Sequence, residues 1–152
     1  MPTELMELLY RGDRAGALKI ARERDLDVFE AAALGALETL IERCEEDGRR
    51  VGATSDDGWT PLHLAAFFGQ LGAVKELLRR GAFVDGRSTN GDVTPLHSAA
   101  VADNADVVAV LIAAGADVDA TQASGHRPLD AARRNGNAAM VAMLEAAGAQ
   151  PG

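Results

Sequence analysis

A short motif that recurs at nearly constant spacing constrains this chain more than any other feature. Residues 60–66 read TPLHLAA, and residues 94–100, which begin 34 positions later, read TPLHSAA. Residues 127–132 (RPLDAA) form a degraded third copy that begins 33 positions further on. A period of 33–34 residues predicts an array of similar structural units, each stacked on its neighbours, rather than one irregular core.

The repeated motif has the chemistry of a helix start. Thr60 suits an N-cap, because its side-chain oxygen can accept a hydrogen bond from an otherwise unpaired helix N–H. Pro61 follows at the first helical position, where no N–H is needed and φ is already close to the helical value. Gly69 falls where the chain must reverse after a short helix, and Gly81 falls where a second helix must end. Each period therefore predicts two helices separated by a tight turn.

A second motif, Gly-Ala-x-Val, keeps the same spacing at residues 81–84 and 115–118. A period of this length that carries TPLHxAA resembles the ankyrin repeat, in which each unit is a β-turn followed by two antiparallel helices. The resemblance implies an all-α solenoid of antiparallel helix pairs joined by short β-turn fingers. It also implies that His63 and His97 hydrogen-bond within their turn and across to the next unit, which is a structural role rather than metal binding.

The spacing of these motifs divides the chain into units. We expect one domain over residues 1–152, made of a cap-like helix pair (3–24), a divergent repeat (26–52), two repeats (53–86 and 87–120) and a C-terminal capping repeat (121–150).

Two irregularities in this array carry structural predictions. The finger at residues 90–93 is one residue longer than its neighbours, and Asp103 replaces the glycine between two helices. Aspartate tolerates a left-handed backbone better than most residues, so we expect the turn at Asp103 to be kept. In the first pair, residues 11–13 (RGD) are interpreted as a helix reversal at Gly12 with Asp13 capping the next helix, rather than as an integrin-recognition motif.

The composition excludes several classes of function. The net charge is −8, which argues against nucleic acids and anionic membranes as partners, because affinity for phosphates comes mainly from Lys and Arg. No apolar run approaches the roughly 20 residues of a transmembrane helix, and the N-terminus lacks the features of a signal peptide. The single cysteine, Cys44, is expected to be buried in a protein of a reducing compartment. We therefore predict a cytoplasmic protein, and the 13 arginines against two lysines suggest a bacterial source.

No motif for catalysis is found in the sequence. Ser98 follows His97 but lies one turn into a helix without the surroundings of a nucleophile elbow. Zinc sites need closely spaced Cys, His or carboxylate ligands, and Cys44 has no second cysteine. We therefore expect a non-enzymatic protein with no metal and no cofactor.

The ankyrin resemblance also implies a binding surface for protein partners, the concave face formed by finger tips and first helices. By position, its candidate residues are Asp56, Asp57, Trp59, Phe67, Phe68, Asp92, Val93, Val101, His126, Arg133 and Arg134. In the divergent repeat, the positions equivalent to the two phenylalanines are assigned to Ala33 and Leu34. Arg133 and Arg134 are either a basic spot beside the apolar residues or a solvated helix end.

The aromatic residues of this surface leave two interpretations open. Trp59, Phe67 and Phe68 are three of only six aromatic residues in the chain. They suit an interaction hot spot if their side chains are exposed. Alternatively, one or both phenylalanines pack against the finger loops and Leu34 or Val101 as part of the core.

The leading functional hypothesis is a monomeric module that binds a protein or peptide partner on the concave face. One alternative is a small-molecule-responsive or catalytic protein that uses the same groove, which would require a closed pocket with convergent polar groups. Another is a scaffold that self-associates through the apolar patch. The shape of the groove and the exposure of the aromatic side chains distinguish these hypotheses.

Overall fold

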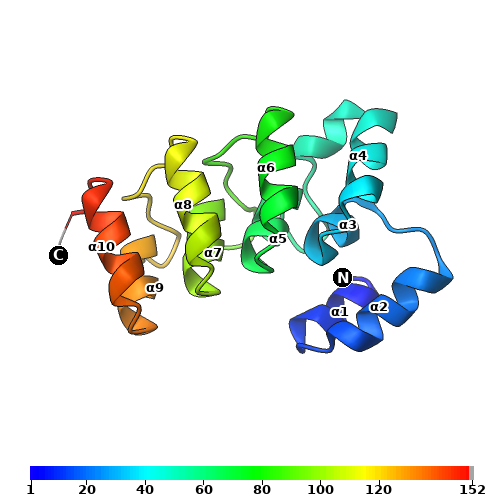
Figure 1. Ribbon diagram of the computed structural model, residues 1–152, viewed down its shortest axis with the longest axis horizontal. Coiled ribbons are helices and arrows are strands. Elements are labelled where there is room, and N and C mark those ends of the chain that lie inside the picture. The colour runs from blue at the N-terminus through cyan, green and yellow to red at the C-terminus, as the bar shows by residue number, and fades with distance from the viewer. Residues whose placement is uncertain (151–152) are drawn as a thin grey trace.

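The computed structural model describes residues 1–150, which form ten α-helices, one 3₁₀ helix and no strand. The helices form antiparallel pairs that stack side by side into an elongated array (Figure 1). Their bounds are α1 (Glu4–Tyr10), α2 (Arg14–Glu23), α3 (Val28–Leu34), α4 (Leu37–Glu46), η1 (Gly48–Gly52), α5 (Pro61–Phe67), α6 (Leu71–Arg79), α7 (Pro95–Val101), α8 (Ala105–Ala113), α9 (Pro128–Arg134) and α10 (Ala138–Ala146). The predicted all-α solenoid is confirmed.

The first helix of each repeat begins as the motif predicts. The Thr60 hydroxyl oxygen accepts from the backbone N–H of His63 at 3.3 Å, and Pro61 is the first residue of α5. The helix α7 begins in the same way. In α9 the capping threonine is replaced by Arg127, and the Asp130 carboxylate accepts from the backbone N–H of Arg127 at 2.8 Å. Asp130 therefore takes over the acceptor role that a histidine ring has in the other two repeats.

The two buried histidines link neighbouring repeats. The Nε2 atom of His63 donates to the Val93 carbonyl at 2.7 Å, and the Nε2 atom of His97 donates to the His126 carbonyl at 3.0 Å. Because a carbonyl oxygen can only accept, Nδ1 of each neutral ring is left to accept from the threonine hydroxyl, at 2.7 and 2.8 Å. Burial lowers the pKa of both imidazoles. The structural role predicted for His63 and His97 is confirmed.

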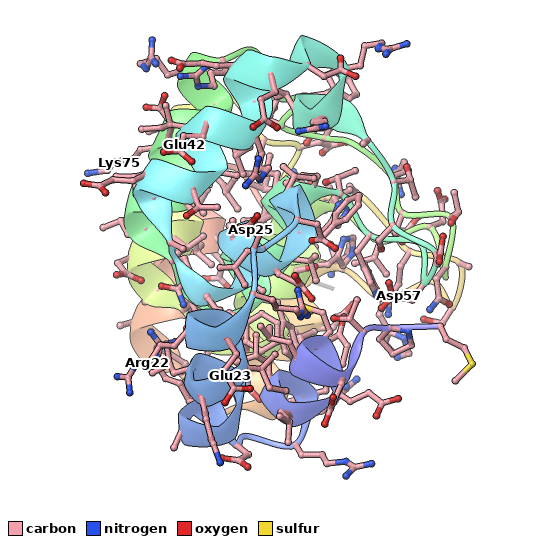
Figure 2. All side chains as sticks on the ribbon, turned by 90° about the vertical axis from the view of Figure 1, so that its right-hand side faces the viewer. Arg22, Glu23, Asp25, Glu42, Asp57 and Lys75 are labelled. Carbon is pink, nitrogen blue, oxygen red and sulfur yellow. The ribbon has the colours of Figure 1, made fainter. Side chains whose placement is uncertain are left out.

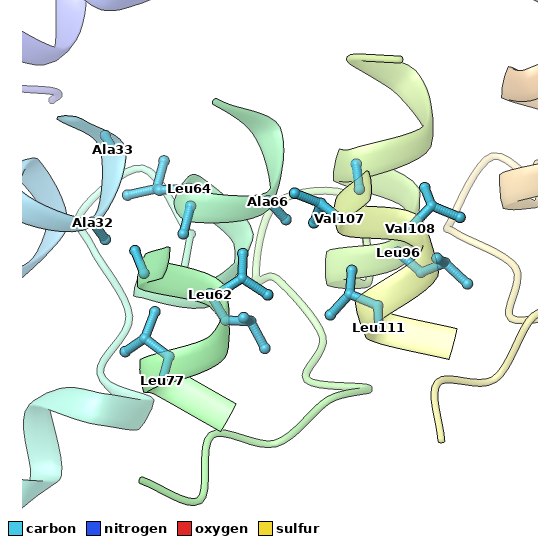
Figure 3. Close-up of a cluster of buried hydrophobic side chains, with 14 of the residues drawn as sticks. Ala32, Ala33, Leu62, Leu64, Ala66, Leu77, Leu96, Val107, Val108 and Leu111 are labelled. Atoms are coloured by element: carbon cyan, nitrogen blue, oxygen red, sulfur yellow. The ribbon is translucent and has the colours of Figure 1, made fainter. Parts of the chain in front are cut away.

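The core lies between successive repeats. The first helices α3, α5, α7 and α9 pack on one another in sequence, and the second helices do likewise. Figure 3 shows leucines such as Leu62 and Leu77 in one cluster with small side chains such as Ala66. Leu62, Leu77, Leu96 and Leu111 are almost completely buried, and each such leucine stabilises the fold by about 1.5–3 kcal/mol.

The fingers are closed by backbone hydrogen bonds and bonded to one another. Ser55 N–H donates to the Trp59 carbonyl at 2.8 Å, whereas Ser88 N–H donates to the Val93 carbonyl at 2.9 Å across one extra residue. The extra residue fits because Asp92 adopts a left-handed φ of 56°. Asp103, with a φ of 63°, has the left-handed turn that the sequence predicts.

The N-terminal helix pair has an orientation of its own. Its turn is built as predicted, with a φ of 81° at Gly12 and the Asp13 carboxylate accepting from Gly16 N–H at 2.9 Å. The axes of α1 and α2 are turned away from those of the stacked helices (Figure 1). Because α1 packs on α3, Ala33 and Leu34 are 0% and 5% exposed. The two positions assigned as equivalent to Phe67 and Phe68 are therefore buried in the divergent repeat.

A buried carboxylate holds this pair against the array. Glu30, in α3, is 0% exposed and accepts from the Arg24 guanidinium at 2.5 and 2.9 Å, from the Thr3 hydroxyl at 2.7 Å and from Asp27 N–H at 3.1 Å. Burial alone would raise the pKa of Glu30, but the hydrogen bonds from Arg24, Thr3 and Asp27 outweigh it and lower the pKa below its ordinary value. The charged form of Glu30 thus connects the segments before α1 and after α2 to α3.

Candidate interaction groove

An apolar groove of about 270 Å³ lies between the fingers and the first helices. Its lining residues are Tyr10, Trp59, His63, Leu64, Phe67, Val93, His97, Ser98, Val101 and Gln122. Four of the predicted site residues, Trp59, Phe67, Val93 and Val101, are among them. Seen along the array, the fingers with Asp57 lie on one side, while Glu42 and Lys75 on the second helices lie on the opposite side (Figure 2).

The three predicted aromatic residues differ in their surroundings. Phe67 is 38% exposed, and its ring meets the Phe68 ring edge-on with centroids 5.0 Å apart. Phe68 is half-buried against the core, and the Tyr10 ring lies 5.8 Å from it. Trp59 is also partly buried, with its indole 5.8 Å from the His63 ring. Of the two interpretations left open, exposure therefore applies best to Phe67, and core packing applies to Phe68.

Tyr10, at the end of α1, is a lining residue that no motif of the sequence indicates. Its hydroxyl donates to an Asp57 carboxylate oxygen at 3.1 Å, which joins α1 to the first finger. Partial burial raises the pKa of Tyr10, and the charge of Asp57 and this hydrogen bond raise it further, so the phenol stays protonated. No local signal could have placed Tyr10 here, because its position depends on how α1 packs on α3.

The acidic candidates lie at the edge of the groove. Asp57 also accepts from the Ser55 hydroxyl at 2.7 Å, and Asp56 is exposed. Both line a second hollow of about 240 Å³, which shares Leu64 with the groove. Asp92, in the next finger, is exposed with its carboxylate 3.4 Å from Arg87.

The remaining candidates lie towards the C-terminal end. His126 is exposed, and its ring is 2.8 Å from the Ser124 hydroxyl. Arg134 occupies the position in its repeat that Phe67 and Val101 occupy in theirs. Arg133 lies one position earlier, where the other two repeats have the buried Ala66 and Ala100.

In the last repeat this earlier position, occupied by Arg133, is exposed. The Arg133 guanidinium lies 3.5 Å from Glu145 of α10, and the two side chains line a separate hollow. The structure thus does not bring the proposed basic pair together beside the aromatic residues.

The groove lining suits apolar contact with a ligand rather than proton transfer. No lining residue is a carboxylate, lysine or arginine, and both ring nitrogens of His63 and of His97 are already hydrogen-bonded. Within residues 1–150 no group of three or more His, Cys, Asp or Glu side chains could hold a metal ion. In the same part of the chain, none of the helices has the length and apolar character needed to cross a membrane. Cys44 is buried, which raises the pKa of its thiol.

Comparison with known proteins agrees with the repeat geometry. The family model for ankyrin repeats in three copies matches residues 28–122, which is more than half of the chain. This chain belongs to the ankyrin-repeat family. Ankyrin repeats are generally protein–protein interaction modules and generally non-enzymatic. The match extends from α3 to the third finger, so it includes most of the groove and leaves out Tyr10.

One curated relative is the ankyrin repeat and SAM domain-containing protein 6 of the zebrafish Danio rerio. It is 41% identical over 59 residues, which are 39% of this chain and 8% of the relative. The matched segment thus spans only a small part of that protein. Because this relative is eukaryotic, it gives no support to the predicted bacterial source, which stays a prediction.

Proposed function

We propose that this ankyrin-repeat protein is a non-enzymatic module that binds a protein or peptide partner in the groove of its concave face. The observation that carries the proposal is the pair Phe67 and Val101, which are 38% and 52% exposed and line one groove from adjacent first helices. Large apolar side chains that remain exposed together commonly mark interaction sites. Burial of an aromatic side chain at the centre of an interface is typical of a binding hot spot.

The chemistry of the groove lining favours binding over catalysis. A catalytic site needs polar groups that converge on a substrate in an enclosed pocket. The two histidines of the groove have a structural role, because His63 and His97 each connect their own turn to the next finger. We accordingly assign the groove to a partner surface.

We extend the proposal to the setting in which the protein acts. The net charge of −8 favours a protein partner over nucleic acid or an anionic membrane. A single buried cysteine suits the reducing conditions of the cytoplasm. We propose that the chain acts as a monomer, which is tested by measuring its mass in solution at low and high protein concentration.

The experiment that tests the binding proposal is affinity capture with three baits: the unchanged protein, Phe67→Ala/Val101→Ala and Phe83→Ala. Phe83 is 74% exposed and does not line the groove, so its variant is a matched loss of surface aromatic area. Trp59 and Phe68 are left unchanged because both pack against the core. We expect a partner that is retained by the unchanged protein and Phe83→Ala and is lost from the double variant. Equal retention by all three baits would exclude the groove as the binding site.

A further inference from the structure

Two hollows of different chemistry adjoin on the concave face. The groove and the second hollow share Leu64 as a lining residue, so the two hollows adjoin and an extended chain lying along both would contact each of them. The second hollow is lined by Met1, Pro2, Thr3, Met6, Asp27, Phe29, Thr54, Ser55, Asp56, Asp57 and Leu64. The site available to a partner is therefore longer than the groove alone.

The charges of the two hollows differ. The groove is lined by no carboxylate, lysine or arginine, and burial keeps its two histidines neutral by lowering their pKa. The second hollow has three carboxylates, Asp27, Asp56 and Asp57, and no lysine, arginine or histidine side chain in its lining, so its carboxylates outnumber the one cationic group there, the amino group of Met1. Among residues 1–150, the hydrogen-bond donors to Asp57 are the neutral hydroxyls of Tyr10 and Ser55, and no ion pair there cancels its negative charge.

The N-terminal helix pair completes this composite site. Tyr10 lines the groove, Asp57 lines the second hollow, and the hydrogen bond between them joins the two walls. Thr3 contributes to the second hollow and is bonded at 2.7 Å to the buried Glu30, which holds the start of α1 in place. Tyr10, which lies outside the matched residues 28–122, thus forms part of the site where its apolar and acidic parts meet.

We propose that the two hollows together bind a peptide segment in which a large apolar side chain stands next to a lysine or arginine. The apolar side chain fills the groove between Tyr10, Trp59 and Phe67, and the cation lies against Asp56 and Asp57. A cavity of about 150 Å³ is enough to hold a benzene ring, so the groove of about 270 Å³ has room for an aromatic or leucine side chain. This inference rests on the proposed function, because it specifies the partner of the same groove.

The test begins with a library of random displayed dodecapeptides selected on the unchanged protein. Peptides that still bind Phe67→Ala/Val101→Ala are discarded, and the residues enriched in the remainder are counted. We expect an aromatic or leucine residue with a neighbouring lysine or arginine. Trp59 is the only tryptophan of the chain and lines the groove, so its fluorescence measures the affinity of selected peptides that lack tryptophan.

Two variants then separate the parts of the site. Asp56→Asn/Asp57→Asn should weaken binding about fivefold or more at low salt, and high salt should reduce this difference. Its control, Glu38→Gln/Glu42→Gln, removes the same charge from exposed positions of α4 and should leave the affinity unchanged. Tyr10→Phe keeps the ring and loses the hydrogen bond, whereas Tyr10→Ala removes the wall, so the loss should be greater for Tyr10→Ala.

The outcomes distinguish this inference from the proposed function. Groove-dependent peptides without an enriched cation, or an affinity that does not change in Asp56→Asn/Asp57→Asn, would overturn the inference and leave the binding groove standing. Selection that returns no peptide dependent on Phe67 and Val101 would overturn both. Enrichment of the apolar and basic pair, with the losses described, supports both.

Discussion

Gly58 lies close against the neighbouring finger. Its φ is 95°, and a Cβ atom added there would lie 2.9 Å from the backbone nitrogen of Asn90 and 2.7 Å from the Thr89 hydroxyl. The Gly58 carbonyl also accepts from Thr89 N–H at 3.1 Å. The first two fingers thus touch through their backbones, and this contact positions Trp59 beside the groove.

The pair Gly58→Ala and Gly125→Ala tests this contact. Both glycines have a left-handed φ, and Gly125 has no heavy atom within 4 Å of an added Cβ. Both variants incur a backbone cost of about 1–2 kcal/mol, and Gly58→Ala incurs a further 1–3 kcal/mol or so from overpacking. Urea unfolding should show the larger loss of unfolding free energy for Gly58→Ala. Equal losses would show that the fingers separate easily.

The buried histidines predict how stability changes with pH. Burial lowers the pKa of His63 and His97 in the folded protein below the ordinary value of 6.5. As the pH falls below 6.5, the unfolded chain therefore binds protons before the folded one does, and the unfolding free energy decreases. Denaturant unfolding at pH 7.5 and pH 5.5 should show this decrease, and His63→Asn/His97→Asn should show a smaller one. An equal decrease in the double variant would contradict the role of these rings.

Among the helices, those that begin with the repeated motif could be predicted best from the sequence. The starts of α5 and α7 follow from Thr-Pro and the left-handed turn at Asp103 follows from its place between two helices, because both depend on neighbouring residues alone. The orientation of α1 and α2 could not be predicted, since it depends on Glu30 bonding to Thr3 and Arg24 across the chain. The division of the chain into a cap-like pair and four repeats stays a prediction.

Glu30→Gln should loosen the N-terminal helix pair. The substitution removes the charge that Arg24 and Thr3 solvate, and we expect a loss of about 1–3 kcal/mol. Hydrogen exchange in α1 should become faster, whereas Glu46→Gln, which removes an exposed partner of Arg43 and Arg50, should leave α1 unchanged. Unaltered exchange in α1 of Glu30→Gln would show that other contacts hold the pair.

The Glu30 carboxylate also makes the attachment of the helix pair α1 and α2 sensitive to acid. Its pKa in the folded protein lies below the ordinary value of 4.5, so its contribution is complete above that pH and is lost as the pH falls through the lower, folded value. Acid titration followed by exchange in α1 should show loosening below pH 4.5 in the unchanged protein. A loosening that begins well above pH 4.5 would contradict this assignment.

In the molecule as a whole, the stacked repeats place side chains from distant segments in one groove. The register of the repeats was enough to select Trp59, Phe67, Val93 and Val101 as candidates, because equivalent positions line up along the array. It could not reveal Tyr10, which comes from outside the matched repeats, or the contact of Phe68 with the Tyr10 ring. Arg133 was assigned to the groove because it was aligned with Phe67 and Val101, whereas its equivalents in the other repeats are Ala66 and Ala100, one position earlier.

The most direct test of the concave groove is a map of backbone amide shifts when a selected peptide is added to the isotope-labelled protein. We predict that the changes concentrate in residues 56–68 and 92–101 and include Tyr10, which together surround the groove. Amides of α6 and α8, on the opposite side of the array, should change little. A footprint centred on those second helices, with the residues around Phe67 unmoved, would contradict the account.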